Sequence, residues 1–565
     1  MGLAIVPGLS YNNSAGKIRK HRTMEAPCSV MRCCFCGFCL ERGMNLHPEE
    51  VLTDLRRRIP RQWVICFASA VVFGLLAHIF KLTNFIPNWD SLLNLYTDQN
   101  KTELGRCFLM EACSVSSYYD LPWINGLLSL LYIAASSVCV VSLFEVKKTI
   151  PLVLIGGLMA TFPTVTSTFA YMYTADGYFL ALLCVCIATI LVTRSRRYLL
   201  PAGVLIAFGM GVYQAYVTFA MVLMLLILVD RLVFQKVSPR EFFALLARFL
   251  GSGIVGAVGY WGALKLITVF SGVELSHYQS IDSAFSLERI DLLKSLRRIA
   301  GHFVRFFFDL SQGVNLYIVL NLALFLLIGW LFVGIVRRQK TAKEPWRMLA
   351  LLCCVAAVPF AAFGLYLISA DMIYHNVMTM SLCLIYLIPL ICYDRMPRER
   401  TGSSTAQQWM VLVLTALTIY NFTLIANISY QKLYMAYERS YGVAVRMADR
   451  IEQLPEARRC TKIATFGCLP GAEAISSNLP PDITGVTDNW ILRKQDASMA
   501  ENVTQAMLRD YCGISYEDTT QEEKERLAET EAYQQMPCWP EPGAIAAIDD
   551  VLVVKYSIRM KTPND

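Results

Sequence analysis

The sequence predicts an α-helical membrane protein with about eleven transmembrane helices and a small α/β domain at its C-terminus. The first observation is composition: 55% of residues are hydrophobic and 17% are charged, whereas a soluble protein carries about 25% charged residues. The second is distribution, because the apolar residues gather in long runs separated by short basic loops. The third is that such runs stop near Ile428, beyond which strand-like and charged stretches alternate.

Each predicted transmembrane run is close to the roughly 20 apolar residues that a bilayer-spanning helix needs. The apolar stretch Leu199–Val233 is too long for one spanning helix, so we expect two short spans there. The predicted spans are Trp63–Phe80, Pro122–Phe144, Pro151–Phe169, Tyr178–Val192, two within Leu199–Val233, Phe249–Phe270, Asn315–Val336, Met348–Ser369, Val377–Tyr393 and Gln408–Ile428.

Basic residues alternate with the spans and predict the orientation. Four arginines precede the first span: Arg56, Arg57, Arg58 and Arg61. The positive-inside rule therefore places the N-terminus in the cytoplasm. The short loops predicted to be cytoplasmic each carry two or more Lys or Arg, and the three short outer turns carry none. An odd number of spans then places the C-terminal tail outside the cytoplasm, in a multi-pass protein of the cell membrane.

Three regions follow: a cytoplasmic segment 1–61, a transmembrane domain 62–428 and an extracytoplasmic domain 429–565. Residues 1–43 show no amphipathic period, and we expect translation to start at Met44. Cys36 and Cys39 have the C-x-x-C spacing, but a structural zinc site needs four ligands, usually two pairs. No second pair follows, so we do not expect zinc; lipidated cysteines beside the membrane are an alternative.

The C-terminal tail predicts a helix over Tyr430–Leu454 and strands over Lys462–Phe466 and Ala546–Lys555. On an oxidising face, its four cysteines predict disulfides. Cys460–Cys468 and Cys512–Cys538 are one pairing, although sequence does not fix connectivity. The predicted outer loop adds Cys107 and Cys113.

The Asn84–Asp120 loop, between the first two predicted spans, carries the polar residues that suggest chemistry. Asp90 lies close behind the first span, and Arg106 follows Gly105. A carboxylate at the membrane surface can accept a proton from an attacking hydroxyl. A guanidinium matches phosphate through two parallel hydrogen bonds. A carboxylate at this position can therefore meet a lipid-linked headgroup at the membrane surface.

A second group of cations lies in the long outer segment Ser271–Gly313. Its stretch Leu287–Leu310 has near-helical spacing of Leu and Phe between basic residues and predicts an amphipathic helix on the membrane surface. Arg298 and Arg305 are phosphate-binding candidates there. The alternative is that these side chains reach towards lipid headgroups.

Three motifs, in order, resemble the bacterial type II glucosyl transferase family, the serotype-converting enzymes that modify O-antigen. The motifs are Asn88-Trp89-Asp90 followed by Gly105-Arg106, the segment Asp176–Leu182 and the segment Gly209–Tyr216. The resemblance covers most of the chain from about Met44 onward, and the order of the motifs carries it more than any one of them.

The resemblance implies a membrane fold of the GT-C class. It implies an enzyme that takes a hexose such as glucose from a polyprenyl-phosphate donor and passes it to a cell-surface glycan or lipid-linked acceptor. An acid in the first outer loop is the expected catalytic residue of such enzymes, and Asp90 occupies that position. Asp176 occupies the second outer turn, Tyr171–Asp176, where some relatives keep another acid.

The candidate catalytic residues are therefore Asp90, Arg106 and Asp176. Several alternatives stay open, since either acid could cap a helix and Arg106 could be a solvated loop charge. A divalent cation, Mg²⁺ or Mn²⁺, shared by the two acids is a further alternative, because hard cations prefer carboxylate oxygens. The candidate substrate-binding residues are Trp89, Tyr213, Gln214, Arg298 and Arg305; for Tyr213 and Gln214 the alternative is simple interfacial placement.

Other classes of function fit the sequence less well. No long basic patch is interleaved with aromatic residues, so nucleic acid is not an expected partner. A transporter or flippase of lipid-linked glycans would place charges and internal repeats near the midplane, whereas the acids here lie at the predicted outer face. A non-catalytic surface receptor, with the tail as its working part, is the remaining alternative.

Overall fold

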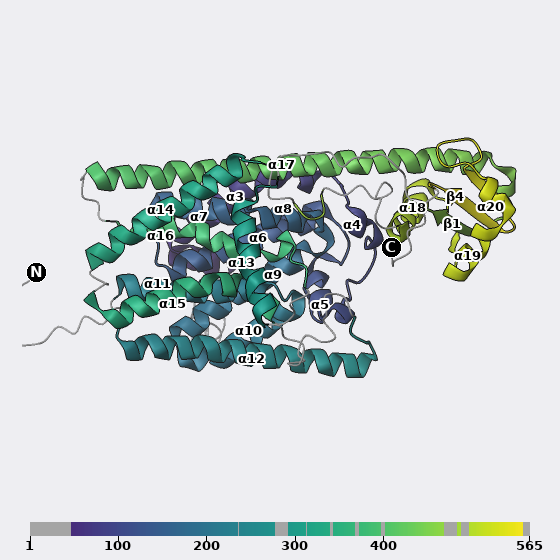
Figure 1. Cartoon of the computed structure of the whole chain (residues 1–565). Helices are drawn as coiled ribbons and strands as arrows, with labels where there is room; N and C mark the ends of the chain where they lie inside the picture. The colour runs from purple at the N-terminus through teal and green to yellow at the C-terminus, as the bar shows by residue number, and fades with distance from the viewer. Residues whose placement is uncertain are drawn as a thin grey trace, which may run out of the picture. The chain divides into compact units, whose positions relative to one another are not determined.

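The computed structural model describes residues 47–235, 237–276, 292–311, 313–339, 343–367, 372–396, 402–467, 483–486 and 497–557. The chain divides into two compact units, Met1–Arg61 and Gln62–Asp565. The first contains helix α2 (Pro48–Arg58), whose last turn is basic. The second contains the elements described below, apart from the first residue of the first bundle helix (Figure 1).

The second unit is mainly a bundle of apolar helices, which confirms the predicted fold class. Within the described residues, nine helical segments are long and apolar enough to cross a membrane. The other two of the eleven predicted spans fall on shorter apolar helices, α10 with 14 residues and α16 with 13, which are below the length of a spanning helix. The bundle helices are α3 (Arg61–Thr83), α6 (Pro122–Leu143), α7 (Thr149–Thr161), α8 (Pro163–Ala170), α9 (Met172–Arg194), α10 (Leu199–Val212), α11 (Tyr216–Phe234), α12 (Pro239–Ser271), α14 (Leu316–Gln339), α15 (Pro345–Ala362), α16 (Cys383–Arg395) and α17 (Gly402–Gln453).

Small residues let the bundle helices approach closely. A Cβ added to Gly203 of α10 would lie 2.4 Å from Val255 of α12, and one added to Gly256 would lie 2.5 Å from Ile206. Association in a membrane depends on such close packing, because lipid tails are as apolar as the side chains. The reciprocal glycines therefore fix α10 against α12.

The bundle departs from the predicted spans in two places. The predicted span Pro151–Phe169 is two helices, because Phe162 leaves the helical conformation with ψ 140° and Pro163 begins α8. Helix α9 starts at Met172, six residues before the predicted start at Tyr178. The predicted outer turn Tyr171–Asp176 is therefore wrong, and Asp176 is a fully buried residue inside α9.

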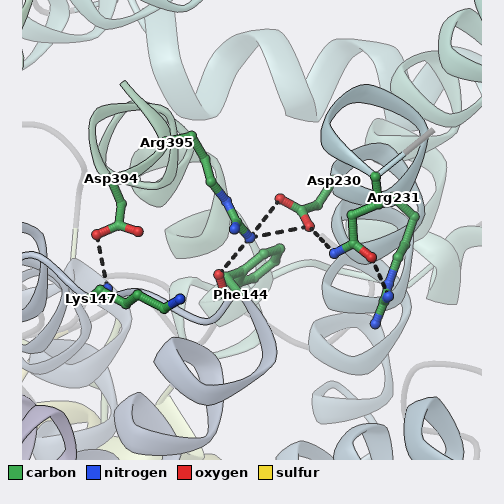
Figure 2. Close-up of polar contacts among 7 residues, drawn as sticks. Phe144, Lys147, Asp230, Arg231, Asp394 and Arg395 are labelled. Carbon is green, nitrogen blue, oxygen red and sulfur yellow. Dashed lines mark hydrogen bonds and ion pairs between the residues drawn. The ribbon is translucent and has the colours of Figure 1, made fainter. Parts of the chain in front are cut away.

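Hydrogen bonds and an ion pair connect side chains with helix ends where α6, α11 and α16 end (Figure 2). Arg395 donates to the Phe144 carbonyl oxygen at 2.8 Å and lies 3.4 Å from Oδ1 of the buried Asp230. Asp394 accepts hydrogen bonds from the backbone N–H groups of Lys147 and Lys148, at 2.9 and 2.7 Å. These contacts satisfy backbone groups at the end of α6 and the start of α7, which otherwise lack helical partners.

Helix α17 is a single helix of 52 residues (Figure 1). The sequence predicted a span, Gln408–Ile428, and a separate helix, Tyr430–Leu454, but no break separates them. At 1.5 Å per residue the helix is about 78 Å long, far more than the roughly 30 Å of a bilayer core. Its later turns, with Ala444 and Met447, are buried in the core of the C-terminal region, residues 429–565.

The C-terminal region contains a four-stranded sheet with the order β2-β1-β4-β3. Strand β1 (Lys462–Phe466) matches the prediction and pairs in parallel with β4 (Val551–Lys555). The predicted strand Ala546–Lys555 is a hairpin, because Asp549 has φ +57° and turns the chain between β3 (Ile545–Ile548) and β4. The remaining elements are η10 (Pro455–Arg459), α18 (Ala497–Cys512), β2 (Glu517–Asp518), α19 (Gln521–Glu529) and α20 (Glu531–Gln535).

The predicted disulfides are wrong where the structure describes both partners. Cys512 and Cys538 are free thiols, as are Cys107 and Cys113. Cys460 is also free and donates its S–H to the Glu456 carbonyl oxygen at 3.7 Å, while Cys468 lies outside the described residues. An even number of cysteines is a compositional signal, whereas a disulfide needs Cα atoms within about 7 Å.

The predicted amphipathic stretch Leu287–Leu310 contains helix α13 (Leu292–Phe308); its first five residues lie outside the described part. One side of α13 is buried through Ser295 and Ile299, and Leu293 on the other side is exposed. Phe306 and Phe307 belong to the main core of the bundle. The helix is therefore amphipathic, as predicted, and its last turn is part of the packed bundle.

Candidate functional site

Asp90 lies in a short helix, α4 (Trp89–Leu93), within the Asn84–Asp120 loop. The cap of this helix is Asn88, whose side chain accepts a hydrogen bond from the Ser91 N–H at 2.8 Å. The alternative role of Asp90 as the cap is therefore wrong. Its carboxylate is half-buried, accepts from the Asn94 amide at 2.9 Å and accepts from the Tyr173 hydroxyl on α9.

The surroundings of Asp90 favour its protonated form. Burial is the largest cause and raises the pKa of the carboxyl above its usual range, while the Tyr173 hydroxyl and the Arg106 charge oppose that shift. Desolvation of a carboxylate has this effect because the charged form loses water. Asp90 is thus a better proton acceptor than a solvated aspartate.

Arg106 is held by the loop backbone and by tyrosines of the bundle. Gly105, with φ +71°, allows a tight turn in which Lys101 and Arg106 form an isolated β-bridge. The guanidinium donates to the Tyr178 hydroxyl at 2.9 Å and lies 4.9 Å from the centroid of the Tyr213 ring. A solvated loop charge would have no such partners.

The two tyrosines beside Arg106 stack on each other. The rings of Tyr178 on α9 and Tyr213 after α10 stack with centroids 4.3 Å apart and planes at 11°. A cation over such faces is attracted by the ring electrons. Tyr213, a predicted site residue, therefore lies beside Arg106, and Tyr178 contacts the same guanidinium from a neighbouring helix.

Asp90 and Arg106 belong to the same loop, and the Arg106 charge lowers the pKa of the Asp90 carboxyl, although these two described side chains form no direct salt bridge. The turn before η8 (Asn376–Met378) adds His375, whose pKa is lowered by burial and then by the Arg106 charge. The site therefore combines a carboxylate, a guanidinium, an imidazole and several tyrosine hydroxyls from four separate segments of the chain.

Gln214 and Trp89 lie near this site but contact the structure around it. The Gln214 amide donates to the Leu104 carbonyl oxygen at 3.2 Å and to the Tyr260 hydroxyl at 3.1 Å, and that hydroxyl donates to the Gly105 carbonyl oxygen at 2.9 Å. Gln214 thus fixes the turn that presents Arg106. Trp89 packs against the core of the C-terminal region.

The other predicted cations have different surroundings. Arg298 is half-buried with its guanidinium 6.0 Å from the Tyr366 ring centroid, and Arg305 is exposed. Neither has a described contact with Asp90 or Arg106, so their predicted role in substrate binding stays a prediction.

Asp176 has its own buried environment. Its Oδ1 accepts from the Asn125 amide at 3.4 Å, and within the described residues its Oδ2 has no hydrogen-bond partner. Ser116 and Cys113 are its other neighbours. No described contact joins Asp176 to Asp90, and the described residues contain no group of three or more His, Cys, Asp or Glu side chains arranged for a metal ion.

Sequence reasoning missed Tyr173 and His375 as members of the site. Tyr173 lies in a stretch with two further tyrosines, Tyr171 and Tyr178, and periodicity alone does not show which of them faces the loop. His375 is an isolated histidine in a short turn and carries no spacing signal.

The comparison with known protein families identifies the class of this membrane protein as a transferase. The family model described as Glucosyl transferase GtrII matches residues 79–392, more than half of the chain. The chain belongs to this family of glucosyl transferases. No curated protein and no solved structure matches it. The matched part contains the Asn84–Asp120 loop, α9, α10 and the turn with His375, and it ends before α17.

Proposed function

We propose that this membrane glycosyltransferase moves glucose from a polyprenyl-phosphate-linked donor to a cell-surface glycan, or a similar acceptor, at the outer face of the membrane. The observation that supports the proposal is the presence in one loop of a half-buried carboxylate, Asp90, and a guanidinium, Arg106, which is held over stacked tyrosines. The choice of glucose as the transferred sugar rests on membership of the glucosyl transferase family.

In the proposed reaction the acceptor hydroxyl attacks the anomeric carbon of the donor sugar. A new glycosidic C–O bond forms, and the bond from that carbon to the phosphate oxygen breaks. The hydroxyl proton passes to Asp90, as general-base catalysis requires. The polyprenyl phosphate leaves with the bonding electrons, and Arg106 stabilises its charge through parallel N–H donors.

The proposed orientation places residues 1–61 in the cytoplasm and the C-terminal region outside. It rests on the basic loops, including Arg194, Arg196 and Arg197 at the end of α9. With that orientation Asp90 and Arg106 belong to the outer face, where a glycan acceptor is accessible.

Replacement of Asp90 tests the chemistry. Asp90→Asn keeps the size and most hydrogen bonding but removes the proton acceptor, so turnover should fall by roughly 10²–10⁴-fold. The measurement is transfer of radiolabelled sugar by purified protein in reconstituted vesicles, which also separates an enzyme from a flippase or a receptor.

The matched control is Asp98→Asn, an exposed aspartate in the same loop whose Oδ1 accepts from the Asn100 N–H at 3.0 Å. This variant should keep its activity, because asparagine preserves that hydrogen bond. Transfer by Asp90→Asn at the level of the Asp98→Asn control would contradict the proposed role of Asp90.

A further inference from the structure

A four-residue segment of the C-terminal region, Ile483–Val486, is buried in the core of the helical bundle. Ile483 and Val486 are 2% and 1% exposed. Both belong to the hydrophobic cluster formed by the bundle helices, and neither belongs to the two clusters around the sheet. In sequence the segment lies between β1 and α18, so the C-terminal region contributes side chains to the bundle.

Thr484 joins two parts of the bundle through hydrogen bonds. Its carbonyl oxygen accepts from the Ser167 hydroxyl of α8 at 3.0 Å. Its own hydroxyl oxygen accepts from the Asn376 N–H at 3.2 Å. The segment therefore bridges the end of α8 and the turn at the start of η8.

Gly485 is fitted to its place by both conformation and space. Its φ of +90° lies in the left-handed region, which glycine adopts without strain. A Cβ at this position would lie 2.8 Å from the Tyr171 ring and 3.0 Å from the Ala170 Cβ. The backbone of the segment therefore lies in close contact with the junction of α8 and α9.

Both bridged parts carry residues of the candidate site. Tyr171 directly precedes α9, where Tyr173 donates to the Asp90 carboxylate. Asn376 directly follows His375, whose pKa is lowered by burial and then by the Arg106 charge. Ala170, on the same junction, also accepts a hydrogen bond from the Ser91 hydroxyl of α4 at 3.4 Å.

We propose that Ile483–Val486 is a positioning segment for sugar transfer, which fixes the α8–α9 junction and the His375 turn near Asp90 and Arg106. The proposal rests on the proposed function, because it assigns the segment to that site. It extends the site beyond the family-matched residues 79–392, into the C-terminal region. None of the four residues is assigned a chemical step.

Two pairs of substitutions in the full-length protein test the segment. Gly485→Ala adds a methyl group against Tyr171, and its control, Gly513→Ala, makes the same change at φ +70° with no atom within 4 Å of the new Cβ. Thr484→Val removes the oxygen that accepts from Asn376, and Thr484→Ser restores it. The readouts are kcat and acceptor KM for sugar transfer, and hydrogen–deuterium exchange of the Asn376 amide.

We expect Gly485→Ala to lower kcat on the order of tenfold to hundredfold, as small misplacements of catalytic groups do, while Gly513→Ala stays near wild type. Thr484→Val should speed exchange at Asn376 and lower kcat, and Thr484→Ser should recover both. If Gly485→Ala fails to fold, the Thr484 pair decides.

Wild-type kcat in Thr484→Val, or an equal loss of kcat in Gly513→Ala, would overturn the positioning role. Failure of the proposed chemistry is a separate result, because it appears as retained transfer by Asp90→Asn. The exchange measurement needs no sugar substrate and does not depend on that outcome.

Discussion

At the scale of the residue, Asp90 is set apart from the exposed acids of its loop by burial and by its partners. Burial raises the pKa of its carboxyl above the usual range, and the Tyr173 hydroxyl and Arg106 only partly offset this. A general base must be ionised to work. Activity should therefore be full above the raised pKa and should be lost as pH falls through it.

The measurable consequence is a pH profile of kcat/KM whose acid limb lies above the ordinary aspartate range near 3.9. The stability effect has the opposite sign. Between the ordinary and the raised pKa the folded protein binds more protons than the unfolded chain, so Asp90 makes folding less favourable as pH rises through that window. An acid limb that survives unchanged in the residual activity of Asp90→Asn would assign the limb to another group.

At the scale of the element, the end of α10 sets the position of the Arg106 turn. The Phe108 N–H donates to the Gly211 carbonyl oxygen at 2.8 Å, and the Phe108 ring stacks on Phe208 with centroids 5.7 Å apart. A Cβ at Gly211 would lie 2.3 Å from the Phe108 ring and 3.2 Å from the Cys107 sulfur. The loop therefore approaches α10 as closely as a glycine permits.

Gly211→Ala should displace Phe108, and with it Arg106 two residues earlier, and lower sugar transfer by roughly tenfold to a hundredfold. Gly253→Ala in α12 is the matched control, since no atom lies within 4 Å of its added Cβ and alanine favours the helix. Comparable transfer rates for the two variants, at matched amounts of folded protein, would show that the loop tolerates the shift.

At the scale of the whole molecule, the C-terminal region and the bundle each bury side chains in the core of the other. Leu92 of α4 is buried in the core around α17 and α18, while Ile483 and Val486 are buried in the bundle. The helix with Asp90 contacts both, because the Ser91 hydroxyl of α4 also donates to the Ala170 carbonyl oxygen at 3.4 Å. This mutual burial explains why the proposed outer-face site depends on residues far apart in the sequence.

The orientation is open to a direct measurement on intact cells. A cysteine introduced at Ser195, between α9 and η3 (Arg196–Tyr198), should be protected from a membrane-impermeant thiol reagent. One introduced at the exposed Ser114, in the Asn84–Asp120 loop, should be labelled above the background of the parent protein. Labelling of the Ser195→Cys variant from outside would reverse the proposed topology.

The sequence by itself determined the membrane class, the family and most helix positions, because hydrophobic runs and basic loops are properties of neighbouring residues. It also picked out Asp90 and Arg106, since both belong to short local motifs. It placed strand β1 correctly for the same reason.

Only the tertiary structure decided which side chains meet. It paired Arg106 with Tyr178 and Tyr213, gave Asp176 a separate buried environment and turned Gln214 towards the loop backbone. It also left Cys512 and Cys538 unpaired and placed Ile483–Val486 inside the bundle. These results depend on packing between segments distant in sequence, and neither periodicity nor composition records that packing.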